Sequence, residues 1–383
     1  MSSSARPRVL VVVGTRPEGI KLAPVVDSLR ARAVDVEVRL ALTGQHTDLM
    51  DQVLQVFELA VDWDLGIMKE GQSLYDVAHG CLDGVRTVVE AYRPDMIVVQ
   101  GDTASVFFGA LVGFFERVRV GHVEAGLRSR DKWRPYPEEI LRRLTGVVSD
   151  IHFAPTPGAR AHLLAEGVTT SSIHVTGNTV VDALLRIAER PHEARDPVLR
   201  DVVESGRRLV LVTAHRRESF GAPLREAFTA LREIADRFTD VVLLYPVHPN
   251  PQVRGPAEEV LGGHPRIRLT APLDYFDLLF ALRRAALAIT DSGGIQEEAP
   301  SFGTPVLVMR EVTERPEAVE AGVARLVGTD QRLIVQEAVR LLENQRAAPR
   351  VENPYGDGRA GERIADIIVH VLAGKPRRTA DWR

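Results

Sequence analysis

Residues 95–126, DMIVVQGDTASVFFGALVGFFERVRVGHVEAG, decide the fold class. The stretch begins and ends with short β-branched runs, and a longer segment separates them. A strand, a covering helix and a second parallel strand produce this order of short and long segments. Each run ends in polar residues, Gly101-Asp102-Thr103 in the first and His122-Val123-Glu124 in the second. The stretch therefore predicts a βαβ unit with polar side chains at the ends of its strands.

The same alternation extends in both directions along the chain and starts again after about residue 190. It predicts two α/β domains in tandem, each a mostly parallel, doubly wound sheet with helices on both faces, as in Rossmann-like folds. The further runs are RVLVVVG (8–14), VEVRLALTG (36–44), IHFAPT (151–156), IHVTGN (173–178), RRLVLVTAH (207–215), VVLLYPVH (241–248), RIRLTAP (266–272), ALAITDSGG (286–294) and PVLVMRE (305–311).

The length of 383 residues agrees with two domains of about 150 residues or more each. A charged segment with two prolines, residues 189–206, shows no strand pattern and is predicted to connect them. We expect the first domain at residues 1–185 and the second at residues 186–359. An amphipathic helix within residues 360–383 is expected to pack back on the first domain.

The composition excludes several classes of protein. Hydrophobic residues make up 45% and charged residues 26%, which is ordinary for a globular protein. A net charge of −4 gives no electrostatic reason to expect nucleic acid or an anionic membrane as a partner. The single cysteine, Cys81, fits a reducing compartment, and the apolar run near the N-terminus is too short for a signal peptide or a membrane span. A cytoplasmic protein is expected.

The turn Asp291-Ser292-Gly293-Gly294 lies between a predicted buried strand and a predicted helix. Two glycines let backbone amides approach a phosphate closely, and the helix N-terminus favours negative charge. The turn is thus a candidate diphosphate site, and a plain tight turn is the alternative. Glu298, one helical turn further on, is a candidate for binding ribose hydroxyls, unless it is a solvated carboxylate.

Two cations follow the first predicted strand. Arg16 precedes Pro17, which suits the first turn of a helix, and Lys21 lies one turn later. The helix dipole disfavours cations at this end, so a bound anion would explain them. Solvated surface charge is the alternative interpretation.

Three carboxylates are candidates for acid and base chemistry. Asp102 and Glu124 end predicted strands, and Glu138 begins a predicted helix. Strand-end acids also cap helices, which is the alternative for Asp102. His215 and His248 follow strands of the second domain, and a histidine beside arginines suits a leaving diphosphate. A structural role is the alternative for either histidine. No spacing indicates a metal site, and the first turn lacks the GxGxxG pattern of a bound NAD.

A set of ordered motifs covers nearly the whole chain, from about residue 8 to the C-terminal helix. With these motifs the sequence resembles the non-hydrolysing UDP-N-acetylglucosamine 2-epimerases. The motifs are GTRPE-x-IK, TGQH, VQGDT, GHVEAGLRS, PEEI-x-R, VTGNTVVDAL, TAHRRESFG, YPVHPNP, DSGGIQEEAPSFGTPVLVMRE, TERPEAVEAG, LVGTD and NPYGDG.

The resemblance implies a glycosyltransferase-B fold with an active-site cleft between the domains, and a homodimer. It also implies inversion of C2 in UDP-N-acetylglucosamine (UDP-GlcNAc) through loss of UDP to 2-acetamidoglucal and re-addition, without a cofactor or a metal. By resemblance the catalytic residues are Asp102, Glu124, Glu138 and His215. The UDP contacts are Arg16, Lys21, Ser292, Gly293, Gly294, Glu298 and Arg315, and the site for UDP-GlcNAc as an allosteric activator is Gln45, His46 and Gln72.

The sequence departs from the family pattern at several positions. His46 is followed by Thr47-Asp48, Leu141 replaces a usual asparagine, and Val312 replaces a usual threonine. Residues 129–133 also differ from the usual loop. A changed sugar or a role in specialised metabolism is therefore an alternative, as are a hydrolysing epimerase, a glycosyltransferase, and a paralogue that binds a nucleotide sugar without turnover.

Overall fold

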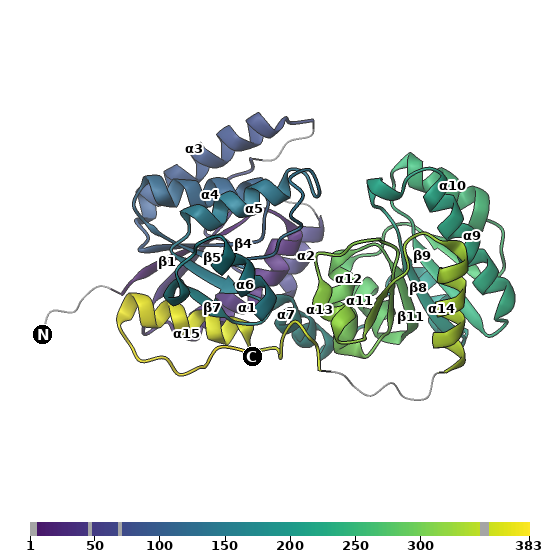
Figure 1. Cartoon of the computed structure of the whole chain (residues 1–383). Helices are drawn as coiled ribbons and strands as arrows, with labels where there is room; N and C mark the ends of the chain where they lie inside the picture. Colours follow the sequence, from purple (N-terminus) through teal and green to yellow (C-terminus); the bar gives the residue numbers. More distant parts are fainter. Residues whose placement is uncertain (1–5, 45–47, 68–70, 345–351) are drawn as a thin grey trace, which may run out of the picture. The chain divides into compact units, whose positions relative to one another are not determined.

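The computed structural model describes residues 6–44, 48–67, 71–344 and 352–383. The chain divides into two compact units, and each is considered by itself (Figure 1). The first unit contains residues 1–183 and 355–383, and the second contains residues 184–354. Within the described ranges, no helix is both long enough and apolar enough to cross a membrane.

The first unit contains a seven-stranded parallel sheet in the order β3-β2-β1-β4-β5-β6-β7. The chain runs outward from β1 to β3 and then returns to place β4 beside β1, so the strand order reverses between β1 and β4. This reversal is the topological switch point, where open α/β sheets bind ligands. The strands are β1 (Arg8–Val13), β2 (Glu37–Leu42), β3 (Trp63–Asp64), β4 (Met96–Gln100), β5 (Arg119–Val123), β6 (Ile151–Ala154) and β7 (Ile173–Val175).

Right-handed crossovers put the helices that connect β1 to β2 and β2 to β3 on one face of this sheet, and those that connect the strands from β3 to β7 on the other. Helix α1 accordingly packs against α2 and α15, while α4 packs between α3 and α5 (Figure 1). Apolar side chains of α3 and α4 cover β1 and β4 in one buried cluster. The helices are α1 (Arg16–Arg30), α2 (Asp48–Val56), α3 (Leu74–Tyr92), α4 (Ala104–Phe115), α5 (Glu138–Val148), α6 (Pro157–Ala165), η1 (Thr170–Ser172), α7 (Thr179–Ala188), whose last turns belong to the second unit, and α15 (Ala360–Ala373).

The second unit repeats this plan with six parallel strands in the order β10-β9-β8-β11-β12-β13. Its switch point lies between β8 and β11. The elements are α8 (Pro197–Glu204), β8 (Arg208–Thr213), η2 (Arg217–Ser219), α9 (Ala222–Arg237), β9 (Val241–Pro246), α10 (Pro251–Leu261), β10 (Ile267–Thr270), α11 (Tyr275–Arg284), β11 (Ala285–Thr290), α12 (Gly293–Phe302), β12 (Val306–Val308), α13 (Pro316–Glu320), β13 (Ala324–Leu326) and α14 (Gln331–Glu343).

These two sheets confirm the predicted fold of two doubly wound α/β domains. The segment at residues 189–206, predicted to be a plain connection, contains helix α8 instead. Asp196 caps this helix by accepting a hydrogen bond from the backbone of Leu199, and Leu199 is buried. Asp277 accepts further hydrogen bonds from the backbone amides of Arg195 and Asp196, so the segment is bound to the second unit.

Candidate active site

The switch point of the first unit brings together the turns that follow β1 and β4. Glu18, in the first turn of α1, accepts hydrogen bonds from the backbone of Gly14 at 2.6 Å and the hydroxyl of Thr15 at 2.9 Å. It also accepts one from the hydroxyl of Thr103, beyond β4, at 2.8 Å. One buried carboxyl group therefore joins the two turns, and it holds the side chain of Thr103, next to Asp102.

Burial raises the pKa of Glu18 from 4.5 to about 7, although its hydrogen bonds to Gly14, Thr103 and Thr15 oppose the shift. Because the folded pKa lies above the unfolded value, the folded protein keeps a proton that the unfolded chain loses. The resulting stabilisation is complete below pH 4.5 and is lost as the pH rises to about 7. We expect the free energy of unfolding of the wild type, relative to Glu18→Gln, to fall by about 3 kcal/mol across this range. Urea unfolding at several pH values measures it, and a constant difference would contradict the expectation.

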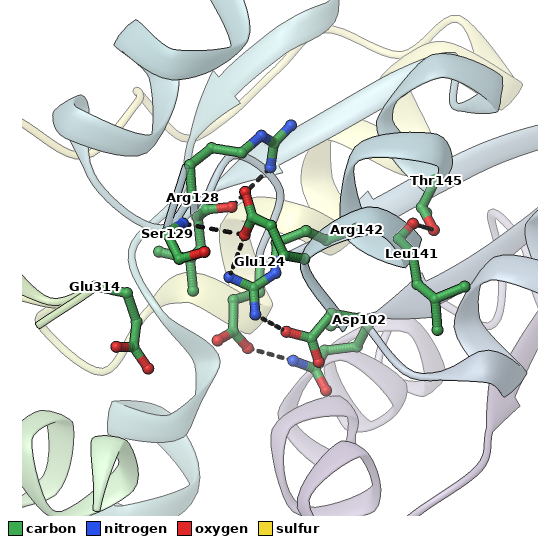
Figure 2. Close-up of polar contacts among 12 residues, drawn as sticks. Asp102, Glu124, Arg128, Ser129, Leu141, Arg142, Thr145 and Glu314 are labelled. Atoms are coloured by element: carbon green, nitrogen blue, oxygen red, sulfur yellow. Dashed lines mark hydrogen bonds and ion pairs between the residues drawn. The ribbon is translucent and has the colours of Figure 1, made fainter. Parts of the chain in front are cut away.

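Asp102 lies two residues beyond β4, on a turn that begins with Gly101 at a φ of 91°. Nε2 of His122 lies 2.8 Å from the carbonyl oxygen of Gly101. Burial lowers the pKa of His122 to about 3, so its ring is neutral and donates this hydrogen bond. The guanidinium of Arg142, from α5, donates to the carboxylate of Asp102 (Figure 2). Hydrogen bonds thus hold both the backbone of the residue before Asp102 and the carboxylate of Asp102 itself.

Glu124 follows β5 directly and has a φ of 65°, a backbone conformation that costs a non-glycine residue about 1–2 kcal/mol. Its carboxylate accepts hydrogen bonds from Nζ of Lys21 at 2.7 and 2.8 Å and from the amide of Gln100. Lys21, predicted as a phosphate ligand, therefore pairs with a candidate catalytic carboxylate in this structure. Glu138 begins α5, and the described residues offer its side chain no hydrogen bond or ion pair.

The second unit places the other predicted residues at its own switch point. Asp291, beyond β11, accepts hydrogen bonds from the backbone amides of His215 at 2.7 Å and Arg216 at 2.8 Å. Nδ1 of His215 lies 3.0 Å from the same carboxyl group. Burial raises the pKa of Asp291, but His215 and these amides outweigh burial and lower it. The ring of His215 stacks on that of His248 at 6.0 Å. Both histidines thus lie together beside the Asp291-Ser292 turn.

The glycine turn forms the N-terminus of α12, as predicted for a phosphate site. A Cβ atom on Gly293 would lie 2.5 Å from Nη1 of Arg315, so the guanidinium lies against the glycine backbone. Arg315 donates to Glu297 at 2.7 Å and to Glu314 at 2.6 Å. The helix N-terminus and a fixed guanidinium therefore lie together, which is an arrangement suited to a diphosphate.

Two more carboxylates border this turn. Glu298 is buried and accepts a hydrogen bond from the hydroxyl of Tyr275 at 2.9 Å. Burial raises the pKa of Glu314, but the charges of Arg315 and Arg310 outweigh it and bring the pKa to about 2. Glu314 is therefore an anion that holds two arginines in place.

Of the three residues predicted to bind an activator, the structure describes one, Gln72. Gln45 and His46 lie outside the described residues. Gln72 donates a hydrogen bond to the carbonyl oxygen of Ile67 at 2.9 Å. In the ranges that the structure describes, no three His, Cys, Asp or Glu residues are grouped so as to hold a metal ion.

Several residues with clear roles in this geometry were not singled out from the sequence. Glu18, Glu139 and Arg142 lie within the quoted motifs GTRPE-x-IK and PEEI-x-R, but no role was assigned to them from the sequence. The separation of Glu139 and Arg142 by three residues predicts an ion pair on one helix face, which was the available signal.

Two doubly wound units with polar switch points define a glycosyltransferase-B-type α/β protein. The model of the UDP-N-acetylglucosamine 2-epimerase family matches residues 28–369. The UDP-N-acetylglucosamine 2-epimerase of Yersinia pestis is 47% identical over 371 residues, which cover 94% of this chain and 98% of that protein. The chain belongs to the UDP-N-acetylglucosamine 2-epimerase family.

Two solved structures are similar over nearly the full length. The Staphylococcus aureus MnaA structure, a complex with UDP, has a TM-score of 0.89 and 42% identity and covers 98% of this chain and 100% of its own. The Neisseria meningitidis UDP-GlcNAc 2-epimerase, bound to UDP-GlcNAc, has a TM-score of 0.85 and 38% identity and covers 96% and 100%.

Proposed function

We propose that this protein interconverts UDP-GlcNAc and UDP-N-acetylmannosamine (UDP-ManNAc) as a non-hydrolysing epimerase. The observation that carries the proposal is the pair of carboxylates, Asp102 and Glu124, at the ends of adjacent strands, each held by its own cation. Relatives of the same family bind UDP and UDP-GlcNAc, which supports a UDP-sugar as the substrate. A cytoplasmic location is part of this proposal.

The chemistry explains why such residues are needed. The C2–H bond is not flanked by a carbonyl group, so direct deprotonation at C2 is very costly. In the proposed reaction a carboxylate of the first unit takes the C2 proton, the C1–oxygen bond to UDP breaks, and a C1=C2 double bond forms in 2-acetamidoglucal. UDP then adds back to C1 while C2 receives a proton on its opposite face, so no atoms are gained or lost.

The second unit supplies stabilisation of the leaving group in this proposal. A departing diphosphate carries increasing negative charge at the oxygen that leaves C1. Arg315, His215 and the N-terminal amides of α12 offer charge and hydrogen bonds to such an anion. Glu298 is proposed to bind the ribose hydroxyls. Arg16, at the start of α1, is proposed as a further UDP contact.

Proton NMR of the enzyme with UDP-GlcNAc in D2O tests the proposed reaction. UDP-ManNAc with deuterium at C2 is the expected product, because the C2–H bond must break. Free N-acetylmannosamine and UDP would instead identify a hydrolysing enzyme. Binding of UDP-GlcNAc without any product would indicate a paralogue without turnover on this sugar.

We further propose that UDP-GlcNAc also acts as an activator, through Gln45, His46 and Gln72. Only Gln72 belongs to the described residues. The dependence of the rate on UDP-GlcNAc concentration tests this part, since an activator that is also the substrate gives a sigmoidal curve.

We also infer a homodimer formed through helices α4 and α5. These neighbouring helices expose four large apolar side chains, and contiguous apolar surface is characteristic of interfaces. The four side chains are Phe114, Phe115, Leu144 and Val147.

Val147→Glu is expected to convert the dimer to a monomer, because Val147 is 81% exposed and a charge there would be buried in the interface. Light scattering after size-exclusion chromatography measures the mass. Val34→Glu is the matched control, because Val34 is 83% exposed but follows α1 and lies outside this surface. A monomeric wild type, or a dimeric Val147→Glu protein, would disprove the inferred interface.

A further inference from the structure

Arg142 occupies an unusual position for a charged residue. It lies on α5 with its side chain only 7% exposed, between two carboxyl groups. Nη2 donates to Asp102, and Nη1 donates to Glu139 at 3.3 Å. Its third nitrogen group, Nε, is buried and has no acceptor within the described residues. A buried donor without an acceptor is costly, so fold stability alone does not account for this placement.

Glu139 anchors Arg142 from the other side. Its side chain is 1% exposed, and its carboxylate accepts hydrogen bonds from the backbone amides of Ser129 at 3.0 Å and Arg130 at 3.2 Å. Glu139 is therefore fixed by the loop that precedes α5, and the position of Arg142 is fixed through Glu139. A continuous chain of hydrogen bonds thus runs from this loop through Glu139 and Arg142 to Asp102.

Asp102 depends on this chain for its orientation. Its side chain is 31% exposed, so it is accessible although its carboxylate pairs with Arg142. The turn is fixed separately, by the hydrogen bond of His122 to the backbone of Gly101 and by that of the Thr103 hydroxyl to Glu18. These contacts do not determine the rotation of the Asp102 side chain. Among the contacts of the described residues, the ion pair with Arg142 is the one that determines the rotation of this side chain.

We propose that Arg142 is a positioning residue, anchored by Glu139, that holds the carboxylate of Asp102 in one orientation for its proton transfer. This inference rests on the proposed epimerase function and deepens it. The oxygen of a base has to point at the proton that it accepts. Arg142 meets this need by holding the carboxylate of Asp102. Misplacement of a reacting group by about 1 Å is enough to cost about 100-fold in rate.

The inference predicts the kinetics of a set of variants. Arg142→Ala is expected to lower kcat by about 100-fold with KM changed less than about threefold, because Asp102 remains but is no longer oriented. Arg142→Lys keeps the charge but lacks the planar fork, so its kcat is expected to lie between those of Arg142→Ala and the wild type. Guanidinium ion added to Arg142→Ala is expected to restore part of the rate. Arg143→Ala is the matched control, because Arg143 is the next residue, is 52% exposed and is expected to be dispensable.

The decisive experiment is a double-mutant cycle with Asp102→Asn, measured as C2 deuteration by NMR. If Arg142 acts only through Asp102, adding Arg142→Ala to Asp102→Asn has no further effect on kcat. Multiplication of the two losses would overturn the inference, and so would a normal rate for Arg142→Ala or a lack of guanidinium rescue. If Arg142→Ala does not fold, as judged by thermal unfolding, Arg142→Lys takes its place in the cycle. A wild type without turnover would refute the proposed function itself, whereas an active wild type with a fully active Arg142 variant would refute only this inference.

Discussion

Asp102→Asn is expected to lower kcat by about 100- to 10,000-fold, the range that loss of a general acid or base produces. The amide has nearly the same shape but does not accept the proton, and it no longer forms an ion pair with Arg142. The affinity for UDP is expected to change less than about threefold, because the proposed diphosphate contacts of Ser292, Gly293 and Arg315 lie in the second unit. NMR in D2O measures turnover, and calorimetric titration measures UDP binding.

The matched control for Asp102→Asn is Asp95→Asn, because Asp95 lies at the opposite end of the same strand. The carboxylate of Asp95 accepts a hydrogen bond from the backbone of Arg8 at 2.7 Å, away from the switch point. We expect normal turnover from this variant. If Asp102→Asn retained near-normal turnover, Asp102 would be eliminated as an essential acid or base, and Glu124 and Glu138 would become the candidates.

The fold was predictable because the parallel strands are buried on both faces and therefore appear as continuous apolar runs. Eleven such runs were recognised, and β3 and β13 were not. β3 has two residues, Trp63–Asp64, and β13 has three, Ala324–Leu326. Strands this short form because β3 pairs with β2 and β13 pairs with β12, and not because of a local sequence pattern. The sequence alone therefore gives little sign of them.

Helix α8 was missed for a different reason, since its local signals are present. Asp196-Pro197 is a typical helix start, with a capping side chain followed by proline at the first position. Charge and two prolines in residues 189–206 suggested a linker instead. The burial of Leu199 and Val202, which fixes the helix, depends on the rest of the second unit.

The sequence predicted which candidate residues lie at the ends of strands. It did not predict which side chains form ion pairs with them. The rule that ligands bind beyond strand ends located Asp102 and Glu124. Their partners Arg142 and Lys21 come from helices α5 and α1, and no sequence spacing indicates that Lys21 reaches a residue 103 positions away. The role expected for Lys21 from the charge pattern was to bind an anion, and the structure adds its pairing with Glu124.

Gly293→Ala is expected to weaken UDP binding by about 10- to 100-fold, which corresponds to the loss of about one charge-assisted hydrogen bond. The added Cβ would lie 2.5 Å from Nη1 and 2.6 Å from Cζ of Arg315. Arg315 cannot move aside freely, because Glu297 and Glu314 hold it at 2.7 and 2.6 Å. Alanine favours helices more than glycine does, so weaker binding would not come from loss of α12.

Gly294→Ala provides the contrast that identifies the cause. Its Cβ would meet nothing closer than 3.8 Å, so Arg315 is expected to stay in place and UDP affinity to change less than about threefold. Calorimetric titration with UDP compares the two variants directly. Unchanged binding by Gly293→Ala would show that the position of Arg315 does not matter for UDP. Equal losses of UDP affinity in both variants would show instead that the turn needs glycine because the phosphate itself approaches the backbone. The N-terminus of α12, rather than Arg315, would then be the main diphosphate contact.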